Sequence, residues 1–280
     1  MPILLALTSA LVYGIADYCG GRASRVFASA LVTFVGQVVS LTLVVGIVLV
    51  AGTPVPDGST FAWGTFGGAA GALGLVSLYH SFANGAMTVV APLSAVTGAI
   101  VPVAVGLVDG ERPGGIAYAG IALALVAVAL ISGAVGERDR PTPRPIMALA
   151  LFAGLCFGVL FVALDRTDPD SGLWPLAAAR MSSVPILFVL VLVLRARPGR
   201  HRGPLLLAVL TGFLDMAANL AYLEAVRGGM LSVVAVVSSL YPASTVALAF
   251  ALDRERVDRW QGVGMGLAAA ALVLVTLGRA

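Results

Sequence analysis

The stretch Thr88-Val89-Val90-Ala91 returns, with one conservative change, as Ser232-Val233-Val234-Ala235, 144 positions further along the chain. The same offset aligns the charged pair Glu111-Arg112 with Glu255-Arg256. Valine and glycine matches are common by chance in an apolar chain, but a matched charged pair is not, because only 11% of the residues are charged. In a membrane protein, a repeat of this length indicates two bundles of helices around a central site.

The composition places the chain in a membrane. Of its 280 residues 59% are hydrophobic, and the mean hydropathy is +1.01. A helix that crosses a bilayer needs about 20 mostly apolar residues, and continuously apolar runs fit helices rather than the alternating strands of a barrel. The first run lacks a preceding basic segment, so we expect a retained span rather than a signal peptide. The ten predicted spans cover residues 3–20, 28–51, 61–83, 86–108, 114–134, 146–164, 173–195, 204–226, 229–252 and 260–277.

The predicted fold is an all-α membrane protein with ten transmembrane helices, arranged as two inverted five-helix repeats. We assign residues 1–135 to the first repeat, residues 136–145 to a polar, proline-rich linker, and residues 146–280 to the second repeat. Because five is an odd number, the second repeat enters the membrane from the opposite side. Equivalent loops should then differ in arginine content. They do, since residues 51–59 contain no arginine, whereas the corresponding loop between spans 7 and 8 contains four.

Arginine also predicts the orientation. All 17 basic residues are arginines, and basic loops stay on the cytoplasmic side. The odd-numbered loops are the arginine-rich ones, so both termini are expected outside, in a multi-pass protein of the plasma (inner) membrane. These loops contain Arg22, Arg25, Arg138, Arg140, Arg144, Arg195, Arg197, Arg200, Arg202, Arg254, Arg256 and Arg259, whereas the other loops and the C-terminus contain Arg112, Arg166, Arg227 and Arg279.

Scarce residue types exclude several classes of protein. Cys19 and Cys156 lie in apolar runs and are expected to be small core residues. The two histidines are too few for a histidine metal cluster, and the net charge of +3 resides in loops rather than in a nucleic-acid-binding patch. The glycines of residues 67–74 lie in an apolar span and not at a strand-to-helix turn, so they indicate close helix packing, or dimerisation, rather than a nucleotide loop. We expect no cofactor, no metal and no nucleic-acid partner.

Two segments resemble a known family. Residues 86–95 (AMTVVAPLSA), followed by GERP at residues 110–113, resemble the fourth helix of EamA-type proteins, which belong to the drug/metabolite transporter superfamily. Residues 232–256 are similar to the same signature in the second half. Tyr13-Gly14, aligned with Phe157-Gly158, is similar to the aromatic-glycine pair of the family's first helix.

The resemblance implies a central cavity lined by the first four helices of each half, alternating access, and peripheral fifth and tenth helices. It also implies substrates that range from amino acids and nucleotide-related metabolites to drugs, and in many members proton-linked export. Two features depart from the family. Its commonly described topology has cytoplasmic termini, and Pro242 aligns here with Gly98 rather than with a proline, so the helix kinks of the two halves should differ.

Charges within apolar spans are the first candidates for function, because a charge at the bilayer centre costs about 2.5–3.5 kcal/mol. Asp215 lies near the middle of its predicted span, with Asn219 and Tyr222 on the same helix face. We predict that Asp215 binds a proton or a cationic substrate group, or else is hydrogen-bonded for packing. Arg180 is expected to pair with Asp215, to contact an anionic substrate, or to extend toward the interface.

Weaker candidates are uncharged or lie near span ends. Tyr13, Gln37, Ser94, Thr97, Ser238 and Tyr241 are predicted to face the cavity, although serine and threonine also join membrane helices. His80 and Glu224 are 144 positions apart and could form a gate or a proton relay, or lie at the interface with Glu224 paired to Arg227. Asp17 could line the cavity mouth or lie near Arg22.

The sequence therefore predicts a secondary active transporter rather than an enzyme. The predicted protein exports a small metabolite or drug by alternating access, coupled to protons, and is a monomer or homodimer in the lipid bilayer. The alternatives are a lipid-linked flippase of the same superfamily and a non-transporting scaffold or regulatory subunit. An intramembrane enzyme ranks third, because no nucleophile–base pair is visible in the sequence. Substrate identity lies beyond the sequence.

Overall fold

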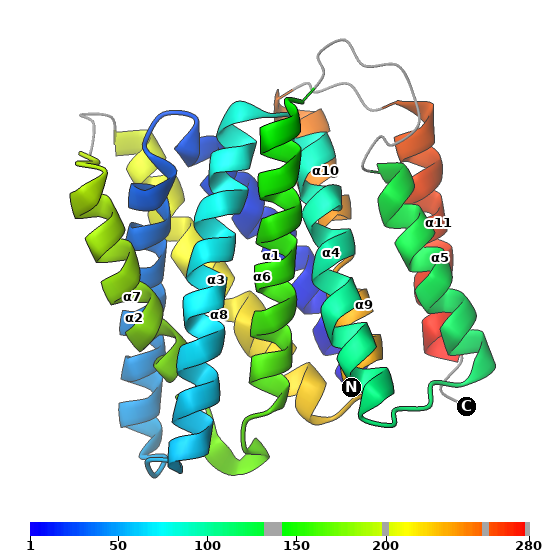
Figure 1. Ribbon diagram of the computed structural model, residues 1–280, viewed down its shortest axis with the longest axis horizontal. Helices are drawn as coiled ribbons and strands as arrows, with labels where there is room; N and C mark the ends of the chain where they lie inside the picture. The colour runs from blue at the N-terminus through cyan, green and yellow to red at the C-terminus, as the bar shows by residue number, and fades with distance from the viewer. Residues whose placement is uncertain (132–141, 198–201, 254–257, 278–280) are drawn as a thin grey trace.

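A computed structural model describes residues 1–131, 142–197, 202–253 and 258–277. In these ranges the chain forms eleven α-helices and one 3-10 helix and no strand, which confirms the predicted all-α class (Figure 1). The helices are α1 (Pro2–Ser24), α2 (Ser29–Ala51), α3 (Gly58–Asn84), α4 (Met87–Val108), α5 (Gly115–Ile131), α6 (Arg144–Asp165), η1 (Pro169–Ser171), α7 (Trp174–Val193), α8 (Arg202–Arg227), α9 (Leu231–Ser238), α10 (Pro242–Asp253) and α11 (Arg259–Leu277).

Some predicted features lie outside these ranges. They are residues 136–141 of the predicted linker, Arg200, and Arg254, Glu255, Arg256 and Arg279.

Eight segments of the described chain are long and apolar enough to cross a membrane. Seven are single helices, α1 to α4 and α6 to α8, and the eighth comprises α9 and α10 together. Helices α5 and α11 contain shorter apolar stretches, Gly115–Ala127 and Gly262–Ala271. The chain is thus a multi-pass integral membrane protein.

The predicted span over residues 229–252 corresponds to the apolar segment Leu231–Asp253, which is divided into two helices. Helix α9 ends at Ser238, and α10 begins at Pro242. Proline has no backbone N–H to donate, and its ring clashes with the carbonyl four residues earlier. Gly98, the residue aligned with Pro242, lies inside an unbroken α4. The predicted difference between the kinks of the two halves is confirmed.

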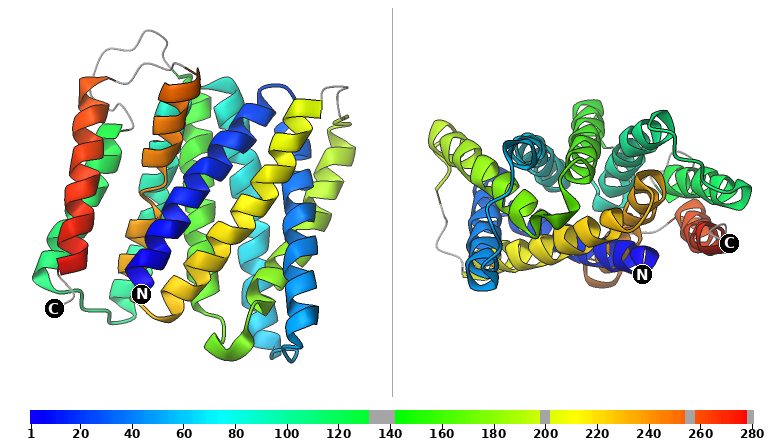
Figure 2. Two further views of the ribbon diagram at one scale, coloured as in Figure 1. Left: turned by 180° about the vertical axis from the view of Figure 1, so that it is seen from behind. Right: turned by 90° about the horizontal axis from the view of Figure 1, so that it is seen from below.

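The helices form an elongated bundle with its contacts mainly between early and late segments. Helix α1 packs along α8, α3 packs against α6 and α7, and α4 packs against α6 (Figure 2). Helices α5 and α11 lie side by side at one edge of the bundle (Figures 1 and 2). This edge position agrees with the peripheral role that the family resemblance implies for the fifth and last spans.

Glycines let several of these helices approach closely. A Cβ atom added to Gly68 of α3 would lie 2.1 Å from the carbonyl oxygen of Ala179 on α7. A Cβ atom added to Gly67 would lie 2.8 Å from the Cβ of Ala163 on α6. The glycine run of α3 therefore serves close packing inside the protomer, the first of the two uses expected from the sequence.

Apart from Arg180, the described arginines divide between the two ends of the bundle. Helix α1 begins and α11 ends at one end (Figure 1). The opposite end has Arg22, Arg25, Arg144, Arg195, Arg197, Arg202 and Arg259, whereas the end with the termini has Arg112, Arg166 and Arg227. This division is the charge asymmetry on which the predicted orientation rests.

Candidate functional site

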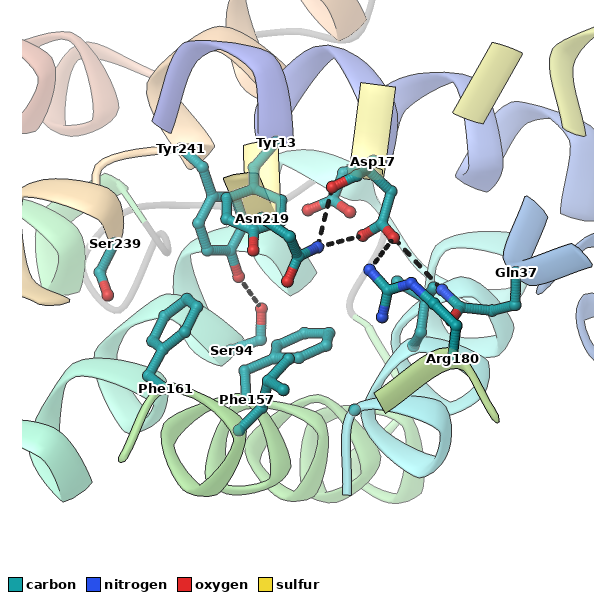
Figure 3. Close-up of a pocket in the computed structure, with 15 residues that line it drawn as sticks. Tyr13, Asp17, Gln37, Ser94, Phe157, Phe161, Arg180, Asn219, Ser239 and Tyr241 are labelled. Carbon is teal, nitrogen blue, oxygen red and sulfur yellow. Dashed lines mark hydrogen bonds and ion pairs between the residues drawn. The ribbon is translucent and has the colours of Figure 1, made fainter. Parts of the chain in front are cut away.

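A pocket lies in the centre of the bundle, between helices of the early and late segments (Figure 3). The space within it, including the part open to solvent, is about 580 Å³. It is lined by Tyr13, Asp17, Gln37, Gly71, Leu75, Ser94, Gly98, Phe157, Leu160, Phe161, Arg180, Asp215, Asn219, Ser239 and Tyr241.

Asp215 on α8 is the centre of a buried polar network (Figure 3). Its Oδ2 accepts from the Arg180 guanidinium at 2.8 Å and from Gln37 Nε2 at 3.2 Å. Its Oδ1 accepts from Asn219 Nδ2 at 3.1 Å. Three donors from three helices therefore compensate this carboxylate, and the expected pairing with Arg180 is present.

Further contacts hold the donors in place. Arg180 is only 3% exposed and donates through Nε to Ser40 Oγ at 2.8 Å. Ser183 donates to the side-chain oxygen of Gln37 at 2.9 Å. The Arg180 side chain thus points into the protein, and the alternative in which it extends to the membrane interface is wrong.

Asp17 on α1 is the second carboxylate of the pocket and, unlike Asp215, it has no compensating donor among the described residues. It is 6% exposed, and no described donor hydrogen-bonds to it or forms an ion pair with it. Three other polar atoms of the pocket are buried without a partner among the described residues, namely the Tyr13 hydroxyl, the Asn219 side-chain oxygen and the Ser239 hydroxyl. Buried polar groups without a hydrogen-bond partner are energetically costly. Several such groups in one pocket are typical of a ligand-binding site.

The break between α9 and α10 places an aromatic side chain in the pocket. Tyr241 lies just before Pro242, and its hydroxyl is 2.5 Å from Ser94 Oγ on α4. Ser94 also donates to the carbonyl of Ala91 at 2.9 Å. This contact ties the broken helix to α4 across the pocket.

Sequence reasoning missed the apolar wall of the pocket, formed by residues of α3 and α6. Figure 3 shows Phe157 and Phe161 on the opposite side from Asp17 and Asn219. The repeat offered a signal, because four apolar lining residues are the equivalents, 144 positions away, of polar ones. The pairs are Phe157 with Tyr13, Phe161 with Asp17, Gly71 with Asp215, and Leu75 with Asn219.

Five predicted residues lie elsewhere. The Tyr222 ring is fully buried and stacks on Phe161 with centroids 4.1 Å apart, behind the pocket wall. Thr97 and Ser238 hydrogen-bond to backbone carbonyls of neighbouring helices, as helix-joining residues do. The predicted gate residues His80 and Glu224 are both exposed. His80 lies beside Asn84, and Glu224 forms the expected ion pair with Arg227 at 2.8 Å.

The pocket combines charged side chains with apolar ones. Its described lining has two carboxylates and one guanidinium beside aromatic and aliphatic side chains. No group of three potential metal-ligating side chains occurs in the described part of the chain. A multi-pass helical bundle with a polar and aromatic pocket at its centre is the construction of a transporter-type membrane protein.

Comparison with known proteins agrees with this class. Residues 144–277 match the model of the EamA-like transporter family, and this match confirms the resemblance predicted from the motifs. No curated protein matches the chain. A solved structure titled "Crystal structure of protein" is similar over 99% of this chain and 96% of its own, with a TM-score of 0.75 and 16% identity. At that identity the likeness shows the fold alone.

Proposed function

We propose that the protein is a secondary active transporter in which two inverted five-helix halves alternately open the central pocket to each side of the plasma membrane. Residues 1–135 form one half and residues 146–280 the other. The proposed cargo is a small organic metabolite or drug, moved outward in exchange for protons. A non-transporting scaffold does not require a central pocket with unpartnered polar atoms, so these atoms favour a transporter over a scaffold.

Two ion pairs carry the proposal. At the arginine-rich end, Arg22 of α1 contacts Asp253 of α10 at 2.9 Å, and at the other end Arg166, after α6, contacts Asp109, after α4. Arg22 and Arg166 are 144 positions apart, and so are Asp109 and Asp253. The two residues of one ion pair are therefore the repeat equivalents of the two residues of the other. The two equivalent pairs lie at opposite ends of the bundle.

Close backbone contacts follow a similar relationship, shifted by one residue. A Cβ atom on Gly14 of α1 would lie 2.4 Å from the carbonyl oxygen of Tyr241, and one on Gly158 of α6 would lie 3.0 Å from that of Gly98. Gly14 and Gly158 are again 144 positions apart, and Gly98 is the equivalent of Pro242, the neighbour of Tyr241. These matched contacts support an inverted repeat.

The ion pairs are suited to a reversible closure. Each joins the first helix of one half to the fourth span of the other, at one end of the bundle. The side chains of Arg22 and Arg166 are 47% and 36% exposed, whereas that of Asp253 is 10% exposed and also contacts Arg25 at 3.1 Å. Ion pairs with solvent-exposed partners stabilise by only about 0–1 kcal/mol. Contacts of this strength hold one end closed without preventing its opening.

Proton coupling requires a carboxylate that gains and loses its proton during the cycle. Asp215 has three donors, whereas Asp17 has none among the described residues, so we assign the coupling role to Asp17. The titratable and charged groups around Asp17 are Tyr13 on α1, Tyr79 on α3, Arg180 on α7, Asp215 on α8 and Tyr241 before α10.

The test measures access to the pocket from each side. In a variant without Cys19 and Cys156, Ser94→Cys places a thiol in the pocket, and its labelling by a membrane-impermeant maleimide is measured in oriented vesicles. Arg22→Ala should raise the labelling rate from the arginine-rich side, and Arg166→Ala from the other side. Loss of up to about 1 kcal/mol corresponds to a rise of about twofold to fivefold.

Two exposed arginines provide controls. Arg202, at the start of α8, forms no ion pair or side-chain hydrogen bond with the described residues, and among those residues Arg112 donates only to the adjacent Glu111 carbonyl. Replacing either with alanine should leave labelling unchanged. The proposal fails if Arg22→Ala and Arg166→Ala both raise labelling from the same side, or if neither changes it.

A further inference from the structure

We infer that Asp17 and the aromatic wall facing it form a site for an amphiphilic organic cation, with its ammonium group at Asp17 and its apolar body against Phe157 and Phe161. The inference rests on the proposed function, because it takes the central pocket to be the transport site. It names the class of cargo, and it assigns the contact with the cargo to Asp17 rather than to Asp215.

The charge count of the pocket points to a cation. The guanidinium of Arg180 is 2.8 Å from Asp215, and these two charges compensate each other. Asp17 then remains as one carboxylate without a cationic partner among the described residues. A buried anion of this kind is stable only if it is protonated or paired. A proton and an organic cation would thus compete for one group, as exchange transport requires.

The unpartnered atoms match an ammonium group. Asp17 offers carboxylate oxygens, and the side-chain oxygen of Asn219 has no donor among the described residues. The orientation of Asn219 is set by its amide nitrogen, which donates to the backbone and side-chain oxygens of Asp215. Two acceptors therefore face the pocket on the Asp17 side. An ammonium group supplies several donors, whereas a carboxylate would meet acceptors and be repelled.

The opposite wall matches an apolar body. Phe157, Leu160 and Phe161 of α6 and Leu75 of α3 line it. Aromatic faces also attract organic cations, most strongly where water is excluded. A cargo with a charged head and an aromatic or aliphatic body would fill both walls. A small cation without an apolar body would leave most of this wall without contacts.

Binding to the purified full-length protein tests the inference. Tryptamine, tryptophol and indole-3-propionate share one ring and differ in carrying a cationic, a neutral and an anionic group. At neutral pH we expect tryptamine to bind at least about tenfold more tightly than either of the others, because a hydrogen bond to a charged group contributes about 1.5–3 kcal/mol. Tighter binding of indole-3-propionate, or equal binding of all three, would overturn the inference with the wild-type protein alone.

Variants separate the head-group site from the apolar wall. Asp17→Asn should abolish the preference for tryptamine over tryptophol, and thermal stability should not fall, because the substitution removes a buried charge that lacks a partner. Phe161→Leu should weaken the binding of tryptamine and of tryptophol by a similar factor. Asp57→Asn changes an exposed carboxylate at the start of α3 and should leave binding unchanged. Unaltered preference in Asp17→Asn would refute the assignment.

Transport measured in proteoliposomes separates this inference from the proposed function. Tryptamine binding that depends on Asp17, without uptake or counterflow, supports the binding site and contradicts the transporter. If the Ser94→Cys thiol is labelled from both sides as proposed but tryptamine binds no more tightly than tryptophol, the result supports the transporter and contradicts the assigned cargo. The two failures are therefore distinguishable.

Discussion

The Arg180 guanidinium lies 2.8 Å from the Asp215 carboxylate, and both residues are buried, on α7 and α8, which both pack against α2. Removal of one partner leaves the other charge buried and uncompensated, which costs about 3–5 kcal/mol. Arg180→Gln and Asp215→Asn should each lower the thermal stability of the purified protein strongly, and the double variant should recover much of the loss. Additive losses in this double-mutant cycle would contradict a direct pair.

The close contact of α3 with α7 gives a second prediction. A side chain at Gly68 would meet the Ala179 backbone, whereas a Cβ atom on Gly46 of α2 has nothing within 4 Å. Gly68→Val should destabilise the protein by about 1–3 kcal/mol or more through overpacking, seen as early aggregation in a thermal ramp. Gly46→Val is the matched control and should behave like wild type. Equal behaviour of the two variants would show that α3 and α7 are not in close contact.

A carboxylate from the first half holds the start of α9. Glu111 accepts from the backbone N–H of Leu231 and from that of Ser232 at 3.0 Å, and the N-cap residue Met230 provides no side-chain cap. Glu111→Ala leaves both donors without this acceptor and should cost about 1–3 kcal/mol. Glu111→Gln retains one acceptor oxygen and should cost less. If the alanine variant melts at the wild-type temperature, the contact does not contribute to stability.

Asp57 caps α3 outside the membrane spans, where its Oδ1 accepts from the Thr60 N–H at 3.0 Å. This backbone hydrogen bond holds the pKa of Asp57 below its ordinary value. A lowered folded-state pKa means that the stabilisation is present above the unfolded-state pKa and is lost as the pH falls through the folded-state value. Asp57→Ala should therefore lower Tm by about 2–4 °C at neutral pH, with a smaller difference at strongly acidic pH. A difference that grows on acidification would contradict this role.

The arginine distribution predicts which loops face the cytoplasm. Val26 and Val55 are both exposed, the first in the arginine-rich loop after α1 and the second in the arginine-free loop after α2. In a variant without native cysteines, Val55→Cys should react with an impermeant maleimide in intact cells. Val26→Cys should react only after permeabilisation. The reverse pattern would show that the termini are cytoplasmic.

Much of the fold could be predicted from local sequence patterns. Long apolar runs define membrane helices because a helix satisfies its own backbone hydrogen bonds in lipid, and the observed helices follow the predicted spans closely. The break at Tyr241 was not predicted, although Pro242 was recognised as a kink. A proline bends or breaks a helix according to the packing around it, and Pro92 and Pro102 lie within a continuous α4.

The site was only partly predictable. Asp215 and Arg180 stand out in the sequence because a charge in an apolar span is conspicuous. The apolar wall, represented by Phe157 and Phe161, looks like any other membrane-facing stretch until the halves pack together. The repeat related these residues to Tyr13 and Asp17, but an offset in sequence does not show which side chains share a cavity.

The sequence alone therefore determined the membrane class, the helices, the family resemblance and the repeat offset, because these depend on hydropathy and on order along the chain. Only the tertiary structure decided that Asp215 is compensated while Asp17 has no described partner. That difference depends on contacts between helices far apart in the chain, such as Gln37 with Asp215, 178 positions away. Burial and pairing of a charge are properties of its surroundings, and packing alone creates those surroundings.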